Sequence, residues 1–160
     1  MEKAIFAAGC FWGVQYYFDQ VPGVTKTVVG YIGGQTDHPT YWEVASHETG
    51  HAEAVEVTYD PKQVSYETLL KHFFHLHNPT LLNRQGPDIG SEYRSAVFYL
   101  NEAQRKAAQD MIDMHNKYKQ EGKIVTTVEK AGTFWVAEEE HQKFTEKTGM
   151  GACHVPYRPM

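Results

Sequence analysis

Short apolar runs alternate with longer amphipathic stretches along this chain, and the two patterns predict strands and helices in a regular order. Apolar and β-branched runs predict strands at 4–8, 25–32, 52–59, 95–100 and 124–128. Amphipathic spacing predicts helices at 11–20, 66–77, 102–121 and 138–147. Start and stop signals support these bounds, because Ser65 and Asn101 are suited to cap helices while Pro22 and Gly122 follow predicted helix ends.

The opening order of strand, helix, strand, strand, helix, strand is that of the split βαβ, ferredoxin-like arrangement. The predicted fold class is therefore an α/β (α+β) two-layer sandwich, in which helices cover mainly one face of an antiparallel sheet. A further helix and strand are added towards the C-terminus. We expect residues 1–160 to form a single catalytic domain, with 148–160 as a flexible tail that carries Cys153.

Two long segments, 33–51 and 78–93, are rich in Gly, Pro, Asp, Asn and Thr and are predicted to be loops. Loops of this length are uncommon in a compact domain unless they serve a function. Both are therefore expected to contribute to the functional site.

Composition narrows the class of protein. A chain of 160 residues with 41% hydrophobic and 22% charged residues is typical of a globular domain. The formal charge of −5 and the lack of long Lys/Arg runs argue against a nucleic-acid partner. No apolar stretch approaches the ~20 residues of a membrane span, and the apolar run at 4–8 is shorter than the ~7–15 residues of a secretion signal. A cytoplasmic location is therefore expected.

The chain has two cysteines, Cys10 and Cys153, near its opposite ends. A permanent structural disulfide is uncommon in a cytoplasmic protein of this size. Either both are packed thiols or they act as a pair, and the cysteine count leaves both possibilities open.

Cys10 follows a predicted strand and begins a predicted helix. At that position the free backbone N–H groups and the positive end of the helix dipole favour a thiolate, the nucleophilic form. A buried structural cysteine is the simpler alternative. Phe11 and Trp12 lie directly beside it, and these rings either pack in the core or form the wall of a pocket for a small apolar group, such as a thioether methyl.

The segment 47–51, His-Glu-Thr-Gly-His, matches the HExxH pattern of zinc proteases. That chemistry needs a helix that presents both histidines on one face. Here Gly50 interrupts any helix and a predicted strand follows at once, so zinc hydrolysis at His47 and His51 is a weak alternative. The cluster of His72, His75 and His77 is better explained as solvated polar positions on an amphipathic helix, and we expect no metal.

Glu53 lies between Ala52 and Ala54 in a predicted strand. If its side chain points to an apolar environment, burial would raise its pKa and keep it protonated, as a general acid requires. A solvent-facing glutamate is the simpler alternative, which the residues alone favour.

Six stretches taken together resemble the peptide methionine sulfoxide reductase A family. They occur in the family's order between roughly residues 4 and 145: GCFWG (9–13), GYIGG (30–34), PTY (39–41), TGHAEAV (49–55), NRQGPDIG (83–90) and YRS (93–95). The ferredoxin-like order of the predicted elements agrees with the fold of that family. The resemblance also assigns His51 to a family motif rather than to a zinc site.

The resemblance implies a role for each matching residue and requires no cofactor. Cys10 would attack the sulfoxide sulfur, and protonated Glu53 would donate to the sulfoxide oxygen. Tyr41 and Tyr93 would hydrogen-bond that oxygen, and Asp88 would support the network. Phe11 and Trp12 would hold the methyl group and select the S epimer. The implied substrates are free methionine-S-sulfoxide and oxidised proteins, which the enzyme would repair after oxidative stress.

Regeneration of the enzyme is implied to pass through Cys153, the remaining thiol. Cys10 would become a sulfenic acid, Cys153 would form a disulfide with it, and thioredoxin would reduce that disulfide. The small residues at 149–152 suit a segment that must move. The chain departs from the family at Ala45, where many members have another cysteine, and at Asn78, where Asp is common. We expect a monomer that binds neither nucleic acid nor membrane.

Two alternative functions remain open. Zinc hydrolysis at His47 and His51 predicts bound metal and inhibition by chelators. A non-enzymatic redox sensor predicts oxidation of the cysteines by peroxide without release of methionine.

Overall fold

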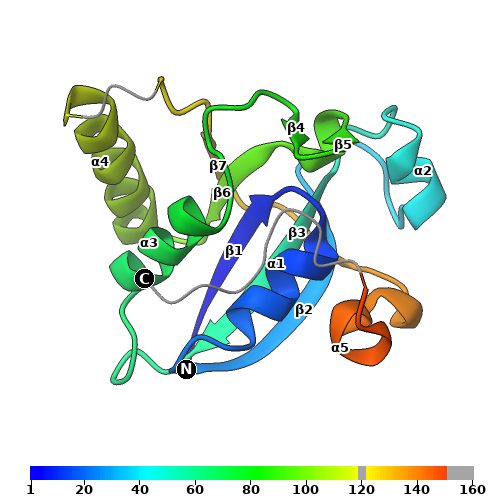
Figure 1. Cartoon of the computed structure of the whole chain (residues 1–160), viewed down its shortest axis with the longest axis horizontal. Coiled ribbons are helices and arrows are strands. Elements are labelled where there is room, and N and C mark those ends of the chain that lie inside the picture. Colours follow the sequence, from blue (N-terminus) through cyan, green and yellow to red (C-terminus); the bar gives the residue numbers. More distant parts are fainter. Residues whose placement is uncertain (119–121, 151–160) are drawn as a thin grey trace.

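The computed structural model describes residues 1–118 and 122–150. Within them, six strands form one sheet in the order β7-β6-β1-β3-β2-β8 (Figure 1). The strands are β1 (Glu2–Ala8), β2 (Val24–Ile32), β3 (Ala52–Tyr59), β6 (Ser95–Tyr99), β7 (Thr127–Lys130) and β8 (Trp135–Val136). The central four, β6-β1-β3-β2, are all antiparallel neighbours, and β7 is parallel to β6. This is the ferredoxin-like order that the sequence predicts.

Helices cover one face of the sheet. α1 (Phe11–Phe18) packs on β2 and β3, and α3 (Tyr66–Leu76) packs on β1 (Figure 1). α4 (Glu102–Tyr118) lies beside α3, β6 and β7. Stacked rings of Phe6, Phe18 and Phe73 join the sheet to both covering helices, with centroid distances of 5.4 and 5.2 Å from Phe6. The predicted two-layer sandwich is therefore confirmed.

Most predicted bounds agree with the structure, and both predicted caps are present. The Ser65 hydroxyl accepts a hydrogen bond from the N–H of Thr68, and the Asn101 side chain accepts one from the N–H of Gln104. The strand predicted at 124–128 instead begins at Thr127. The helix predicted to reach 121 is described as far as Tyr118. None of the described helices is long and apolar enough to cross a membrane.

Both segments predicted as loops contain short elements. Residues 33–51 include α2 (Tyr41–Ala45), and residues 78–93 include the hairpin β4 (Arg84–Gln85) and β5 (Asp88–Ile89) and the 3₁₀ turn η1 (Ser91–Tyr93). α2 begins with a capping box, in which Thr40 and Glu43 each bond the other's backbone N–H. This Thr-x-x-Glu pattern was a readable signal for a helix that the loop prediction missed.

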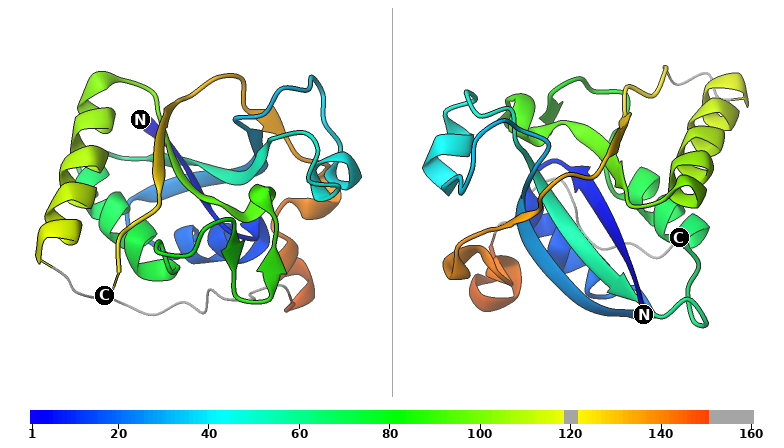
Figure 2. Two further views of the ribbon diagram at one scale, coloured as in Figure 1. Left: turned by 90° about the horizontal axis from the view of Figure 1, so that it is seen from above. Right: turned by 180° about the vertical axis from the view of Figure 1, so that it is seen from behind.

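The helix predicted at 138–147 is wrong as a single element. The structure has a 3₁₀ turn, η2 (Glu139–His141), and then α5 (Phe144–Thr148). Lys143 separates them in the left-handed conformation, with φ of 58°, which a continuous right-handed helix cannot contain. Two views show this C-terminal segment beside α1 at the β2 and β8 edge of the sheet (Figure 2). The predicted tail from 151 onwards, including Cys153, lies outside the described residues.

Candidate active site

Cys10 lies where β1 ends and α1 begins. Gly9 makes the turn with φ of 95°, a conformation that favours glycine, and Cys10 is the N-cap residue of α1. Its side chain is buried, with 6% exposure. The first backbone N–H groups of a helix have no partner within the helix and point towards its N-terminus, so the thiol lies at the electropositive end of α1.

Glu53 is buried beside this helix start. It lies on β3 opposite Tyr31 of β2 and is only 1% exposed, so the solvent-facing alternative is wrong. Its Oε1 accepts a hydrogen bond of 3.2 Å from the backbone N–H of Phe11, the residue after Cys10. This bond brings the carboxyl group next to the cysteine although 42 residues separate Phe11 from Glu53.

Two tyrosines from the two long connecting segments lie within the electrostatic influence of the same carboxyl group. Tyr41 begins α2 and Tyr93 ends η1. Burial, followed by the charges of Glu53 and Cys10, raises the pKa of Tyr41 to about 12. Burial and then Glu53 also raise the pKa of Tyr93 well above its ordinary value. Both phenols therefore remain protonated at neutral pH and can donate hydrogen bonds.

Asp88 lies on β5, half-buried, and its charge also raises the pKa of Tyr41 and of Tyr93. The loop that carries Asp88 is held by a contact between the exposed His47 and the buried Glu92, in which Glu92 Oε1 lies 2.6 Å from His47 Nδ1. A Cβ on Gly90 would clash with Glu92 Oε1 and with the His47 ring, and its φ of 148° lies in the region that favours glycine. Only glycine therefore fits at this point of the loop.

Aromatic rings line the side of the site next to Cys10. Phe11 is fully buried, and its ring lies 5.6 Å from that of Tyr31 and 6.5 Å from that of Tyr41. Trp12 stacks on three rings in turn: Tyr41 at 6.1 Å, His141 at 5.7 Å and Phe144 at 4.0 Å. The structure therefore brings together every predicted site residue within its described part, and Cys153 lies beyond that part.

The C-terminal segment also contributes to the site, which the sequence did not predict. Besides stacking on Trp12, His141 accepts a hydrogen bond of 3.1 Å from Trp12 Nε1 through its Nδ1. Glu138 accepts bonds from the Tyr31 hydroxyl at 2.8 Å and from the Tyr41 N–H at 2.9 Å. Burial alone would raise the pKa of Glu138, but these bonds lower it, so the carboxylate is charged and anchors two site elements.

Two histidines of the cluster that was predicted to be solvated are instead buried. His72 Nδ1 lies 2.7 Å from the Tyr17 hydroxyl, and His77 Nδ1 donates to the Phe73 carbonyl at 2.6 Å.

The described histidines do not form the zinc site considered above. His51 accepts a bond from the Gly34 N–H through Nδ1 at 3.0 Å and donates through Nε2 to the Thr36 carbonyl at 2.7 Å. Both ring nitrogens thus hold the loop, and the residues that follow form β3 rather than a helix. In the part of the chain described, ligand atoms that could share a cation come together at Glu138, Glu140 and His141. Two of these side chains already have partners in the site, because Glu138 accepts from the Tyr31 hydroxyl and His141 accepts from Trp12 Nε1.

Acidification should destabilise the folded protein through His141, the residue that stacks on Trp12 and accepts its hydrogen bond. Burial lowers the pKa of His141 below 6.5, so the unfolded chain binds this proton more readily than the folded one. Its contribution to stability is therefore complete above pH 6.5 and is lost as the pH falls from 6.5 to the lower folded pKa. We expect His141→Gln, which cannot titrate but can still accept from Trp12, to show a smaller fall in unfolding free energy between pH 7.5 and 5.5. Urea unfolding of the parent and of His141→Gln at both pH values measures this fall in unfolding free energy. An equal fall in the two proteins would contradict the expectation.

Comparison with known proteins agrees with this geometry. The family model described as peptide methionine sulfoxide reductase matches residues 2–160. A protein of Geobacter sulfurreducens called peptide methionine sulfoxide reductase MsrA is 52% identical over 96% of this chain and 95% of its own length. One from Methanoculleus marisnigri with the same name is 51% identical over 97% of this chain and 95% of its own.

A solved structure shares the whole fold. Mxr1 from Saccharomyces cerevisiae in its reduced form superposes with a TM-score of 0.91 at 32% identity, over 99% of this chain and 92% of its own. A match to the family model over nearly the full length, together with relatives at about half identity, is decisive. The chain therefore belongs to the peptide methionine sulfoxide reductase A family and is an enzyme of that kind.

Proposed function

We propose that this enzyme reduces methionine-S-sulfoxide, both free and within proteins, with Cys10 as nucleophile and Glu53 as proton donor. The observation that carries the proposal is the hydrogen bond from the Phe11 N–H to Glu53 Oε1. It keeps a buried carboxyl group next to the residue that bears the nucleophile. A sulfoxide that presents its sulfur to Cys10 can therefore present its oxygen to Glu53.

The chemistry requires both groups, because a sulfoxide oxygen leaves sulfur readily only when it is protonated. The Cys10 sulfur attacks the sulfoxide sulfur while Glu53 donates its proton to the oxygen. The S–O bond of the substrate then breaks and the oxygen leaves as water. Water adds to the Cys10 sulfur while the bond between the two sulfurs breaks, its electron pair remaining on the methionine sulfur, and this leaves a sulfenic acid on Cys10. Methionine is the reduced product, and Cys10 has been oxidised by two electrons.

The surrounding residues are proposed to bind the two ends of the sulfoxide group. The protonated phenols of Tyr41 and Tyr93 donate to the oxygen as negative charge develops on it. Asp88 supports their orientation. The rings of Phe11 and Trp12 hold the methyl group, so that one arrangement around sulfur fits and its mirror image directs the methyl towards polar groups.

Stereoselectivity tests this assignment. With dabsyl-methionine sulfoxide and dithiothreitol, we expect the S epimer to be consumed and the R epimer to persist. A-type and B-type methionine sulfoxide reductases each reduce one epimer of the sulfoxide. Chromatographic separation of the epimers measures both at once. Equal consumption of both, or no release of methionine, would contradict the proposal, and the second outcome would favour a redox sensor.

We further propose that Cys153 resolves the sulfenic acid and that thioredoxin closes the cycle. Attack of the Cys153 thiol on the Cys10 sulfur would release water and form a disulfide, which a dithiol partner reduces. Yeast Mxr1 has also been solved in complex with Trx2. This relationship supports a thioredoxin as the partner of the present enzyme.

Cys153→Ser is expected to complete one reduction and then stop when thioredoxin, its reductase and NADPH are the only source of electrons. NADPH oxidation followed over many turnovers measures this. The single reduction should be as fast as in the parent, because Cys153 acts only after the sulfenic acid has formed. Sustained cycling would show that another thiol reduces Cys10 directly.

We propose that residues 1–160 act as one catalytic domain, as a monomer, without a cofactor and in the cytoplasm. The continuous sheet, in which β8, the last strand among the described residues, pairs with β2 near the start of the chain, supports a single domain. Oxidised proteins and free methionine sulfoxide would reach the site directly from solution. Sedimentation of the purified protein tests the proposed monomer.

A further inference from the structure

We infer that Lys143 is a positioning residue for substrate binding. Its ion pair with Asp19 holds the C-terminal segment against α1 and thereby fixes the Trp12 wall, which is the stack that Trp12 forms with the rings of Tyr41, His141 and Phe144. The inference rests on the proposed role of Trp12 in holding the methyl group. It concerns a residue that lies outside the site and that the proposed chemistry does not use.

One face of α1 carries both the wall and its anchor. Trp12, Gln15 and Asp19 are spaced i, i+3 and i+7, so they lie along the same side of the helix. The C-terminal segment runs along this face. Phe144 meets Trp12 at 4.0 Å, while the preceding residue, Lys143, reaches the far end of the helix.

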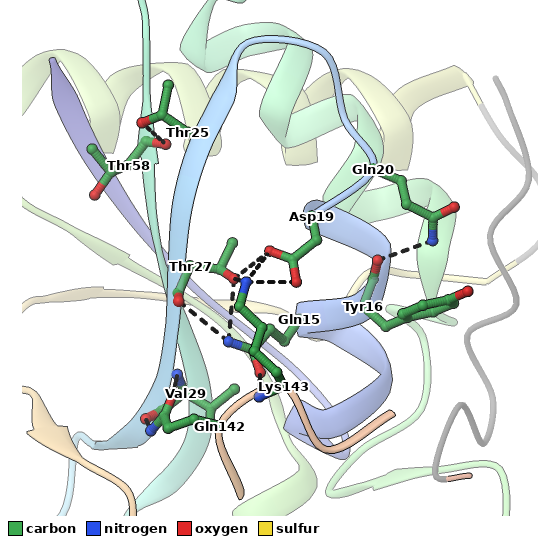
Figure 3. Close-up of polar contacts among 10 residues, drawn as sticks. All are labelled: Gln15, Tyr16, Asp19, Gln20, Thr25, Thr27, Val29, Thr58, Gln142 and Lys143. Atoms are coloured by element: carbon green, nitrogen blue, oxygen red, sulfur yellow. Dashed lines mark hydrogen bonds and ion pairs between the residues drawn. The ribbon is translucent and has the colours of Figure 1, made fainter. Parts of the chain in front are cut away.

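Lys143 makes its contacts with both its backbone and its side chain (Figure 3). Its N–H donates to Gln15 Oε1 at 2.7 Å. Its Nζ lies 2.7 Å from each carboxylate oxygen of Asp19 and 2.9 Å from the Thr27 hydroxyl. The ion pair itself is partly exposed, with 36% for the Lys143 side chain and 23% for that of Asp19. It lies against the buried side chains of Gln15 on α1 and Thr27 on β2.

The network also explains the break in the predicted helix. A lysine in the left-handed conformation is strained relative to the ordinary helical one, and such strain persists only where surrounding contacts hold it. The left-handed turn aims the Lys143 N–H and side chain at α1 and allows Phe144 to stack on Trp12. A straight helix through 143 would not direct both residues to the same face.

The neighbouring residue pins the segment to the sheet. Gln142 accepts a bond from the Val29 N–H at 3.0 Å and donates to the Val29 carbonyl at 2.9 Å (Figure 3). Its amide thus continues along β2 the pairing that β8 makes with Gly30 and Tyr31. Gln142 holds the segment to β2, and Lys143 sets its position along α1. The two contacts together fix where His141 and Phe144 meet the Trp12 ring.

The test is Lys143→Met, which removes the charge and keeps most of the stem. We expect KM for dabsyl-methionine-S-sulfoxide to rise roughly three- to tenfold with kcat changed by less than about twofold, because weaker binding without loss of chemistry has this signature. Lys143→Arg, which can pair with both oxygens of Asp19, should restore most of the KM. Lys147→Met is the matched control, since Lys147 is on the same segment but its Nζ bonds the exposed Glu139, with its carbonyl at 3.3 Å and its carboxylate at 3.8 Å, rather than α1.

Trp12 emission provides a readout that does not depend on turnover. In a Trp42→Phe, Trp135→Phe background, Trp12 is the remaining tryptophan, and Lys143→Met should shift its emission to the red and increase quenching by acrylamide. Unchanged emission and KM in a folded Lys143→Met protein would overturn the inference, as would equal changes in Lys147→Met. If Lys143→Met does not fold, Asp19→Asn replaces it in the same comparison.

Trp12→Ala separates this inference from the proposed function. If Trp12→Ala raises KM but Lys143→Met does not, the wall binds substrate and Lys143 does not position it. If Trp12→Ala itself leaves KM unchanged, the proposed methyl pocket is wrong, and the positioning role for substrate falls with it.

Discussion

Replacing Cys10 with serine is expected to lower kcat/KM for methionine-S-sulfoxide by roughly 10⁴-fold or more, the order of loss that follows removal of a catalytic nucleophile. A hydroxyl has nearly the shape of a thiol, so the buried start of α1 should remain packed. It is, however, a far weaker nucleophile towards sulfur at neutral pH. Methionine release in the presence of dithiothreitol measures the effect.

Cys153→Ser is the matched control for this experiment, because it removes the other thiol while leaving Cys10. With dithiothreitol, which can reduce a sulfenic acid directly, it should retain substantial activity. Unfolding curves of both variants establish that neither is unfolded. Activity of Cys10→Ser near that of the parent would mean that Cys10 is a packed structural thiol, the alternative that its position in the sequence left open.

Replacing Glu53 with glutamine is expected to lower kcat by roughly 10²- to 10⁴-fold, the contribution typical of a positioned general acid. The side chains have nearly the same size, and a Gln carbonyl can still accept from the Phe11 N–H. The fold and the affinity for substrate should therefore change little. Single-turnover release of methionine after rapid mixing isolates the chemical step from later reduction by thioredoxin.

Glu56→Gln is the control for Glu53→Gln. Glu56 lies on the same strand, but it is partly exposed and its carboxylate is 3.5 Å from Lys3 Nζ. Glu56→Gln makes the same chemical replacement on the same strand without touching the site. If Glu53→Gln reduces the sulfoxide as fast as Glu56→Gln, proton donation comes from another group, and the protonated phenols of Tyr41 and Tyr93 are the first candidates.

The central fold was predictable because local pattern and tertiary structure agree there. Apolar runs of strand length and helices with clear caps occur in the ferredoxin-like order, and the observed order β6-β1-β3-β2 follows from it. Prediction failed where tertiary contacts override local pattern. Residues 138–147 have helical spacing, but the bonds of Lys143 to Gln15 and Asp19 support a left-handed turn in the middle.

The candidate site was predictable to the extent that its residues lie in recognisable motifs. Cys10 and Glu53 occur in two such motifs, and the Phe11 N–H to Glu53 bond brings them together. His141 and Phe144 had no comparable signal. They reach Trp12 only because β8 pairs with β2 and folds the C-terminal segment back over α1, a contact between residues far apart in the chain.

The most direct test counts products in one turnover of Cys153→Ser without any reductant. We predict one methionine released per protein and one sulfenic acid at Cys10, trapped by dimedone and located by mass spectrometry of the peptide that contains Cys10. The R epimer should give neither product. Release of methionine from the S epimer without a modified Cys10 would contradict the proposal that the Cys10 sulfur becomes the sulfenic acid.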